Sequence, residues 1–82
     1  MKRRMSSLSV GEEGRIVTVT NKGAIRRRLM DIGFTEGAQV ACLRRSPLGD
    51  PTAFTVKGAV IALRREDAAG IYVETEGIGS WA

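Results

Sequence analysis

Residues 15–34 read RIVTVTNKGAIRRRLMDIGF, and the hydrophobic period changes part-way along this segment. Residues 15–20 are rich in β-branched side chains, which favour a strand. Residues 22–32 follow the period of a helix instead, because apolar side chains recur at i, i+4 and i+7 on one face. The segment therefore predicts a strand followed by a helix, whose core face comprises Ile25, Leu29 and Ile32.

The two ends of this helix carry residues with suitable chemistry. Asn21 is a plausible N-cap, because its side-chain oxygen can accept a hydrogen bond from the first turn. Gly33 suits the left-handed conformation that commonly follows a helix, and Phe34 is then placed to pack back on Leu29 in a Schellman motif. We therefore expect Gly33 to be a structural residue.

Four further short strands are predicted beyond the helix, separated by turns. Gly37 belongs to the first turn, and Lys57 and Gly58 fit a two-residue hairpin turn. Gly49 suits the third position of a type II turn that starts at Pro47. One helical turn is expected between the last two strands. The predicted strands cover residues 38–45, 52–56, 59–63 and 71–74, and the helical turn covers residues 65–70.

These elements predict a mainly β fold. Five short strands cannot bury both faces as an open sheet, so we expect a small barrel with the helix inserted after the first strand and covering one open end. The length allows one domain, which we assign to residues 8–74. Residues 1–7 are expected to form a flexible basic arm. Residues 75–82, which include Trp81, are expected to form a flexible tail.

Composition argues against several functional classes. The chain has one cysteine, Cys42, and no histidine. A catalytic triad or a usual zinc site needs histidine or several cysteines, and the acidic residues show no ligand spacing. We therefore expect no enzymatic activity, no cofactor and no metal site, and we interpret Cys42 as a small buried apolar residue. No apolar run approaches the ~18 residues of a membrane-spanning helix.

The net charge of +4 comes mostly from the N-terminus. Lys2, Arg3 and Arg4 supply three of the thirteen basic residues, and from Met5 onward ten basic and nine acidic residues leave a net charge of +1. We expect the basic arm to favour solubility, with non-specific contact to phosphate or an anionic membrane left open. No aromatic pattern interleaves with the basic residues, which argues against specific nucleic-acid binding; the aromatic residues are Phe34, Phe54, Tyr72 and Trp81.

Several short motifs occur in a fixed order along the chain. They are RLMDIGFTEG at 28–37, PLGDP at 47–51, VKG at 56–58, IALR at 61–64 and IYV at 71–73, preceded by Leu8, Gly11 and Gly14. From about residue 8 to residue 73, this order and spacing resemble the ferrous iron transport protein A (FeoA) family. The resemblance implies an SH3-like barrel without catalytic activity of its own.

The resemblance also implies a partner. Members of this family are small cytoplasmic proteins of bacterial Fe(II) uptake, thought to act on ferrous iron transport protein B, a membrane permease with a cytoplasmic GTP-binding domain. We therefore expect a non-catalytic accessory protein that docks on the cytoplasmic side of the permease and modulates it, so that membrane contact is only indirect. The same fold also ends some iron-dependent repressors, but an 82-residue chain leaves no room for their DNA-binding and metal-binding domains.

Other functions stay open at this stage. A small basic barrel can bind nucleic acid, and the chain can be a free-standing relative of the C-terminal repressor domain. A direct Fe(II) carrier is disfavoured by the lack of histidine and the single cysteine. Assembly into a homo-oligomer is not decided by the sequence.

Two segments are candidates for partner contact. Arg26, Arg27 and Arg28 form a basic run on the helix, with the alternative that they are simply solvated, and Met30 falls off the apolar face beside Asp31. The second segment is a turn that two prolines make rigid, with the alternative that it is a turn and nothing more. Its candidate contact residues are Pro47, Leu48, Gly49 and Asp50, with Leu48 as an apolar anchor if it is exposed.

Overall fold

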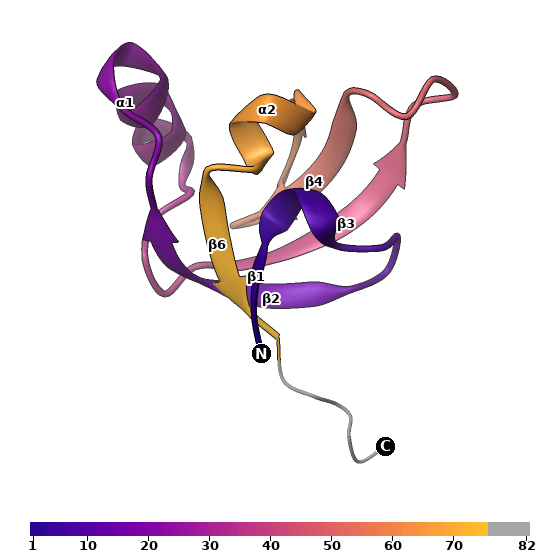
Figure 1. Cartoon of the computed structure of the whole chain (residues 1–82), viewed down its shortest axis with the longest axis horizontal. Helices are drawn as coiled ribbons and strands as arrows, with labels where there is room; N and C mark the ends of the chain where they lie inside the picture. The colour runs from indigo at the N-terminus through magenta and orange to yellow at the C-terminus, as the bar shows by residue number, and fades with distance from the viewer. Residues whose placement is uncertain (76–82) are drawn as a thin grey trace.

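The computed structural model describes residues 1–75, which fold into one six-stranded antiparallel sheet with a single longer helix (Figure 1). The strand order is β1-β6-β2-β3-β4-β5, so β1 and β5 are the two edges. The elements in chain order are β1 (Lys2–Arg4), the 3-10 helix η1 (Met5–Ser7), β2 (Glu13–Val19), α1 (Gly23–Ile32), β3 (Gln39–Arg45), β4 (Thr52–Val56), β5 (Ala59–Leu63), α2 (Arg65–Ala68) and β6 (Ile71–Glu74).

The sheet curls around its core, with η1 and α2 packed together over the opening (Figure 1). The register shifts once in the β2–β6 pair, between Ile16 and Thr18, and once in the β3–β4 pair, between Cys42 and Arg44. Such bulges bend a strand and increase its twist. The fully buried side chains that fill the curl include Met5, Leu8, Ile16, Phe34, Val40, Cys42, Phe54, Val56, Ile71 and Val73.

Helix α1 ends as predicted. Gly33 has a φ of +129°, and its N–H donates to the carbonyl oxygen of Met30 at 3.1 Å. The N–H of Phe34 donates to the carbonyl oxygen of Leu29 at 2.9 Å, which completes a Schellman motif. Phe34 is fully buried, so the helix stop also places a large side chain in the core.

The core face of α1 differs from the prediction. Leu29 is buried, but Ile25 is 40% exposed, because the helix lies beside the sheet and does not plug its opening (Figure 1). Met30, which we expected to be exposed, is half-buried and packs against the core together with Ile32. Asn21 is not the helix cap, since its side-chain N–H donates to the carbonyl oxygen of Asp67 at 3.1 Å.

The N-terminal segment is ordered structure, and the expectation of a flexible arm over residues 1–7 is wrong. Strand β1 pairs with β6, and Met5 in η1 is fully buried. Met5 in η1 comes directly after β1, and its burial anchors the chain there. This anchor holds the residues of β1 against β6. The structure therefore has one strand more than the five predicted, and α1 follows the second strand.

The predicted turns are present, with one difference. Lys57 and Gly58 both have positive φ values, 49° and 82°, as a type I′ hairpin turn requires. Gly37 and Gly49 also have positive φ, but the turn at Gly49 closes one residue earlier than expected, since its N–H donates to the carbonyl oxygen of Ser46 at 2.8 Å. Pro47 consequently occupies the second turn position, which its fixed φ favours.

Within residues 1–75, neither helix has the length and apolar character needed to cross a bilayer. The tail expected over residues 75–82 and its Trp81 lie outside the described residues, apart from Thr75.

Candidate partner-binding surfaces

The three arginines of α1 are exposed, and one of them also has a structural contact. Arg26 donates from Nη1 to the carbonyl oxygen of Val19 at 2.6 Å, which ties the helix to the end of β2. Across residues 1–75, the ion pairs join Arg3 to Glu12 and the N-terminal amine to Glu74, so neither involves this helix. Arg27 and Arg28 therefore present their charges to solvent.

Met30 does not contribute to this basic surface. Its side chain is half-buried and packs against the core cluster. Because the next residue, Asp31, is exposed, α1 turns one acidic and several basic side chains outward. The partner surface that the helix offers is therefore charged, without the apolar contact that we expected from Met30.

The turn between β3 and β4 is closed by hydrogen bonds and carries an apolar tip. Leu48 is 93% exposed, so its side chain contributes nothing to the core. The N–H of Ser46 donates to the carbonyl oxygen of Pro51 at 3.2 Å, which closes the turn at its base. The Asp50 carboxylate accepts a hydrogen bond from the N–H of Arg65 at 2.8 Å, at the start of α2. Asp50 thus has a structural contact, while Leu48 is free to meet a partner.

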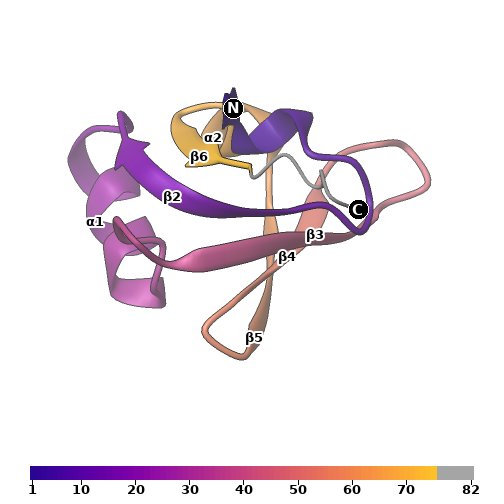
Figure 2. The ribbon, with the colours of Figure 1, turned by 90° about the horizontal axis from the view of Figure 1, so that it is seen from below.

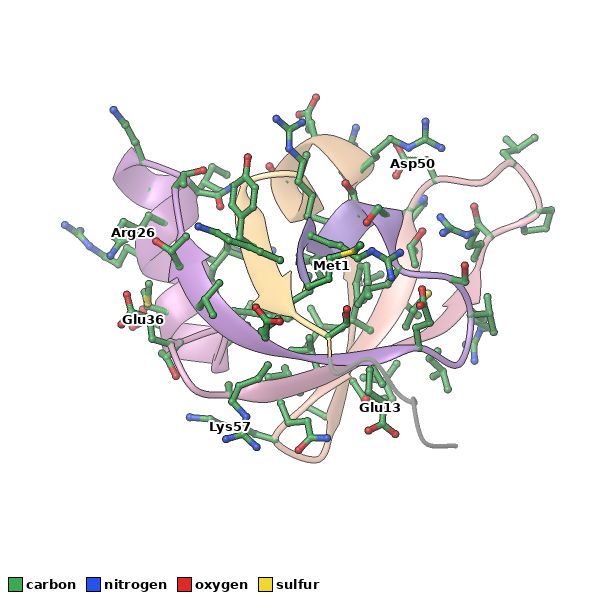
Figure 3. The ribbon with its side chains drawn as sticks, turned by 60° about the horizontal axis from the view of Figure 1, so that its bottom comes forward. Met1, Glu13, Arg26, Glu36, Asp50 and Lys57 are labelled. Carbon is green, nitrogen blue, oxygen red and sulfur yellow. The ribbon has the colours of Figure 1, made fainter. Side chains whose placement is uncertain are left out.

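The structure does not bring these two candidate surfaces together. Helix α1 and the β3–β4 turn lie at opposite ends of the molecule in both ribbon views (Figures 1 and 2). The labelled side chains of Arg26 and Asp50 likewise lie on opposite sides (Figure 3). A single compact partner surface can use one of them, whereas a contact with both requires a partner that spans the molecule.

A third exposed region, strand β5, was not singled out in the sequence. The strand reads AVIAL, and its Val60 side chain is 57% exposed. Its position at the edge of the sheet depends on strand order, which the sequence does not state. The sequence held one indication of this exposed strand, which is that it contains no polar residue although it follows a two-residue hairpin turn.

Burial and hydrogen bonding shift the pKa values of Cys42 and Glu12 in the described part of the chain. Burial raises the pKa of the Cys42 thiol, so this thiol stays protonated and is a poor nucleophile near neutral pH. The hydrogen bond from Arg3, followed by that from the Ser9 N–H, lowers the pKa of Glu12. No group of three or more His, Cys, Asp or Glu side chains in residues 1–75 is placed to hold a metal ion.

A family model described as the FeoA domain matches residues 3–75. The chain belongs to the FeoA domain family. It is 38% identical over 71 residues to an Fe(2+) transport protein A/Fe(2+) transporter FeoB fusion protein of Porphyromonas gingivalis. That match covers 87% of this chain but 8% of the fusion protein, so the chain corresponds to a small part of that relative.

Solved structures of FeoA proteins share the fold of this FeoA-family chain. The solution structure of FeoA from Chlorobium tepidum has a TM-score of 0.84 at 38% identity, covering 90% of this chain and 74% of that protein. Stenotrophomonas maltophilia FeoA, described as a procaryotic SH3 domain protein and crystallised with zinc, has a TM-score of 0.77 at 28% identity, covering 90% and 89%. These likenesses confirm the predicted family and the SH3-like, mainly β fold.

The fold likeness extends to one class of regulator. A manganese-dependent transcriptional repressor has a TM-score of 0.81 over 92% of this chain and 42% of its own, at 17% identity. Identity this low shows a shared fold and nothing about function. The accessory-protein interpretation therefore fits the comparisons better than a repressor-like one.

Proposed function

We propose that this chain is a non-catalytic accessory protein of ferrous iron uptake, which docks on the cytoplasmic side of the Fe(II) permease FeoB and modulates it. The observation that carries the proposal is the P. gingivalis relative, in which an FeoA segment and FeoB belong to one polypeptide. Fusion holds two modules at a high effective concentration, which benefits modules that bind one another. We infer that this FeoA domain makes the same contact with the permease.

The described residues support a binding role. The exposed features are charged or apolar surface groups, namely the α1 arginines, the tip at Leu48 and the edge strand β5. A depression beside α2 and β4, lined by Arg45, Phe54 and Leu63 among others, has no room for even a water molecule. In the described part of the chain, these exposed groups support a role in which the surface of the domain binds a partner.

Modulation of the permease requires differential binding. A bound protein shifts an equilibrium between two states only by the difference between its affinities for them. The accessory protein therefore binds one nucleotide state, or one conformation, of the permease more tightly than the other. The sign of the effect on transport follows from which state it prefers.

Co-purification tests this proposal directly. The full-length permease from the same organism is purified in detergent without nucleotide, with GDP and with a non-hydrolysable GTP analogue, and each sample is mixed with the tagged chain. We expect stoichiometric capture that differs between nucleotide states. A detergent-solubilised membrane protein of similar size is the control. Absence of capture in all three conditions would contradict the proposal, and GTP hydrolysis by the chain alone would contradict its non-catalytic part.

A further inference from the structure

Strand β5 is an edge of the sheet with free backbone hydrogen-bonding groups. It pairs with β4 on one side, in a register that joins Val56 to Ala59 and Thr55 to Val60. Residues that flank a two-residue hairpin turn form a hydrogen-bonded pair, and pairs then alternate along an antiparallel ladder. Ala59, Ile61 and Leu63 therefore direct their backbone groups toward β4. The N–H and C=O groups of Val60 and Ala62 point away from it.

These outward groups have no partner in residues 1–75. No loop, turn or side-chain hydrogen bond of this part of the chain involves Val60 or Ala62. Val60 is 57% exposed, and Ala62 is also exposed. The β4–β5 hairpin projects away from the N-terminal segment, at the bottom of the second view (Figure 2). The outer edge is thus accessible along the strand.

The strand also lacks the features that protect edges from other strands. Edge strands are usually blocked by charged residues, proline, bulges or short length. β5 has five residues, none charged and none proline, and its pairing with β4 runs without a register shift. Ile61 and Leu63 direct their side chains to the core, which holds the strand in place. A regular, apolar and well-anchored edge is a template for an additional strand.

The charges at the two ends of β5 indicate what that strand carries. Lys57 is exposed in the hairpin turn before β5, and its side-chain carbons pass close to Gly33 at the end of α1. Arg64 and Arg65 follow directly after the strand and are exposed. Arg65 is the first residue of α2, where its N–H donates to the Asp50 carboxylate, and Glu66 and Asp67 come next in the helix. An apolar strand between basic ends fits an apolar segment with acidic ends, because such a pairing matches charge as well as backbone groups.

A second copy of this chain fits the edge less well. Two β5 strands paired antiparallel about Ile61 would place Val60 opposite Ala62 of the other copy, which satisfies the backbone. The same pairing would place Lys57 opposite Arg65, so that basic ends meet. Like charges in facing positions are destabilising.

We propose that β5 binds an extended, apolar segment with Asp or Glu at its ends, which adds to the sheet as a further strand next to Val60 and Ala62. The assignment of this segment to the permease rests on the proposed function above. Main-chain hydrogen bonds supply affinity, and the basic ends select the partner and its position.

The test uses a synthetic peptide with five alternating valine and alanine residues and glutamate at both ends, added to the isotope-labelled full chain. We expect NMR shifts centred on β5 and slower amide exchange at Val60 and Ala62. One control peptide has lysine in place of glutamate, and a second is N-methylated at the amides that would face β5; both should bind at least about tenfold more weakly, the effect of losing roughly one hydrogen bond or ion pair. Absence of any shift at about 1 mM peptide, the weakest affinity of interest, would overturn the proposal.

A matched pair of variants tests the edge itself. Val60→Pro removes one outward N–H that β4 does not use, a position where edge strands tolerate proline. Val60→Thr keeps that N–H and the preference for a strand. We expect the proline variant to lose about tenfold or more in peptide binding and the threonine variant to retain it. Equal binding by both variants, or peptide-induced shifts that map to α1 or the β3–β4 turn, would overturn the proposal.

Capture of the permease separates this inference from the function on which it rests. If the wild type and Val60→Pro capture the permease equally, the β5 inference is wrong and the proposed function stands. If the peptide binds at β5 but no permease is captured, the proposed function is wrong while the strand-binding edge stands. Concentration-dependent protection of Val60 and Ala62 without any peptide, together with dimers in sedimentation, would show a second copy as the occupant and overturn the proposal.

Discussion

The two edges of the sheet, β1 and β5, differ in nearly every property that controls whether an edge is open. β1 has three residues, all basic, whereas β5 has five residues and no charge. Two side chains of β1 contact Tyr72 of β6. Lys2 Nζ and Arg4 Cζ lie 5.6 and 5.7 Å from the centre of the Tyr72 ring, and Arg4 Nε donates to the Tyr72 hydroxyl at 3.0 Å. The side chains on the outer face of β5 meet solvent instead.

The two edges of this sheet are therefore protected from added strands to different degrees. Basic residues on a short edge strand prevent further strands from adding, while they also stabilise the pair with β6. β5 lacks this protection, although a lysine or a proline on its outer edge would lower the free energy of unfolding only slightly. We interpret β1 as the closed edge that completes the fold and β5 as the open edge that binds.

The largest loss in the free energy of unfolding is expected from Ile61→Pro. Its N–H faces β4 in the hydrogen-bonded position opposite Phe54, and its side chain packs against the core. Ile61→Pro should lower the free energy of unfolding by about 3 kcal/mol or more, through the lost bond and the disturbed packing. Val60→Pro, one residue away, should cost less than about 1 kcal/mol. Urea denaturation measures both, and equal losses would contradict the assigned direction of the edge.

The next largest loss in the free energy of unfolding is expected from Met5→Ala. Met5 is fully buried and directly follows β1, so its removal leaves a cavity at the place where the closed edge is anchored. We expect a loss of about 2–4 kcal/mol in the free energy of unfolding. The exposed Met1 supplies a matched control, since Met1→Ala should stay within about 0.5 kcal/mol. A small loss at Met5 would restore the flexible arm that the sequence suggested.

Charge reversal at Glu74 tests the pairing of β1 with β6. Glu74 lies between Lys2 of β1 and Arg15 of β2, and it accepts a contact from the N-terminal amine. Glu74→Lys should lower the free energy of unfolding by about 1 kcal/mol, because like charges then face each other across the strand pair. Glu66→Lys is the control, an exposed change outside any described ion pair. Identical thermal unfolding curves for the two variants would contradict a stabilising role for β1.

The smallest effect concerns pH. The hydrogen bond from Arg3 on β1 lowers the pKa of Glu12, so the ionised carboxylate favours the folded state. This stability is present above the ordinary pKa of a glutamate and is lost as pH falls through the lowered value. The pair is partly exposed, so the loss is about 0.5 kcal/mol. Glu12→Gln should remove that part of the acid dependence in urea titrations, and an unchanged dependence would contradict it.

Local patterns predicted most of the fold. The change of period in residues 15–34 gave the strand, the helix and its end at Gly33, because these features depend on neighbours in sequence. The strand at Lys2–Arg4 was missed, since a run of basic residues has no strand pattern and is held by Met5 and β6, which lies far along the chain. Ile25 was placed in the core because the helical period does not show how the helix lies against the sheet. In the structure, α1 leaves Ile25 40% exposed.

The candidate surfaces were harder to predict. The proline-framed turn, a local signal, predicted the turn around Leu48 but left the exposure of that side chain open, and the structure shows it 93% exposed. Met30 was assigned to the wrong side of α1, because period alone does not say how far a helix rotates against its sheet. The open edge at β5 depends on the order of strands, which is a property of the whole fold.

Amide hydrogen exchange on the full chain, with and without the detergent-solubilised permease, shows directly whether β5 is the edge that binds. If β5 is the open edge that binds, the permease should slow exchange at Val60 and Ala62 and leave the residues of β1 unchanged. Protection confined to α1 or to the turn around Leu48, with Val60 and Ala62 exchanging as in the free chain, would contradict the account.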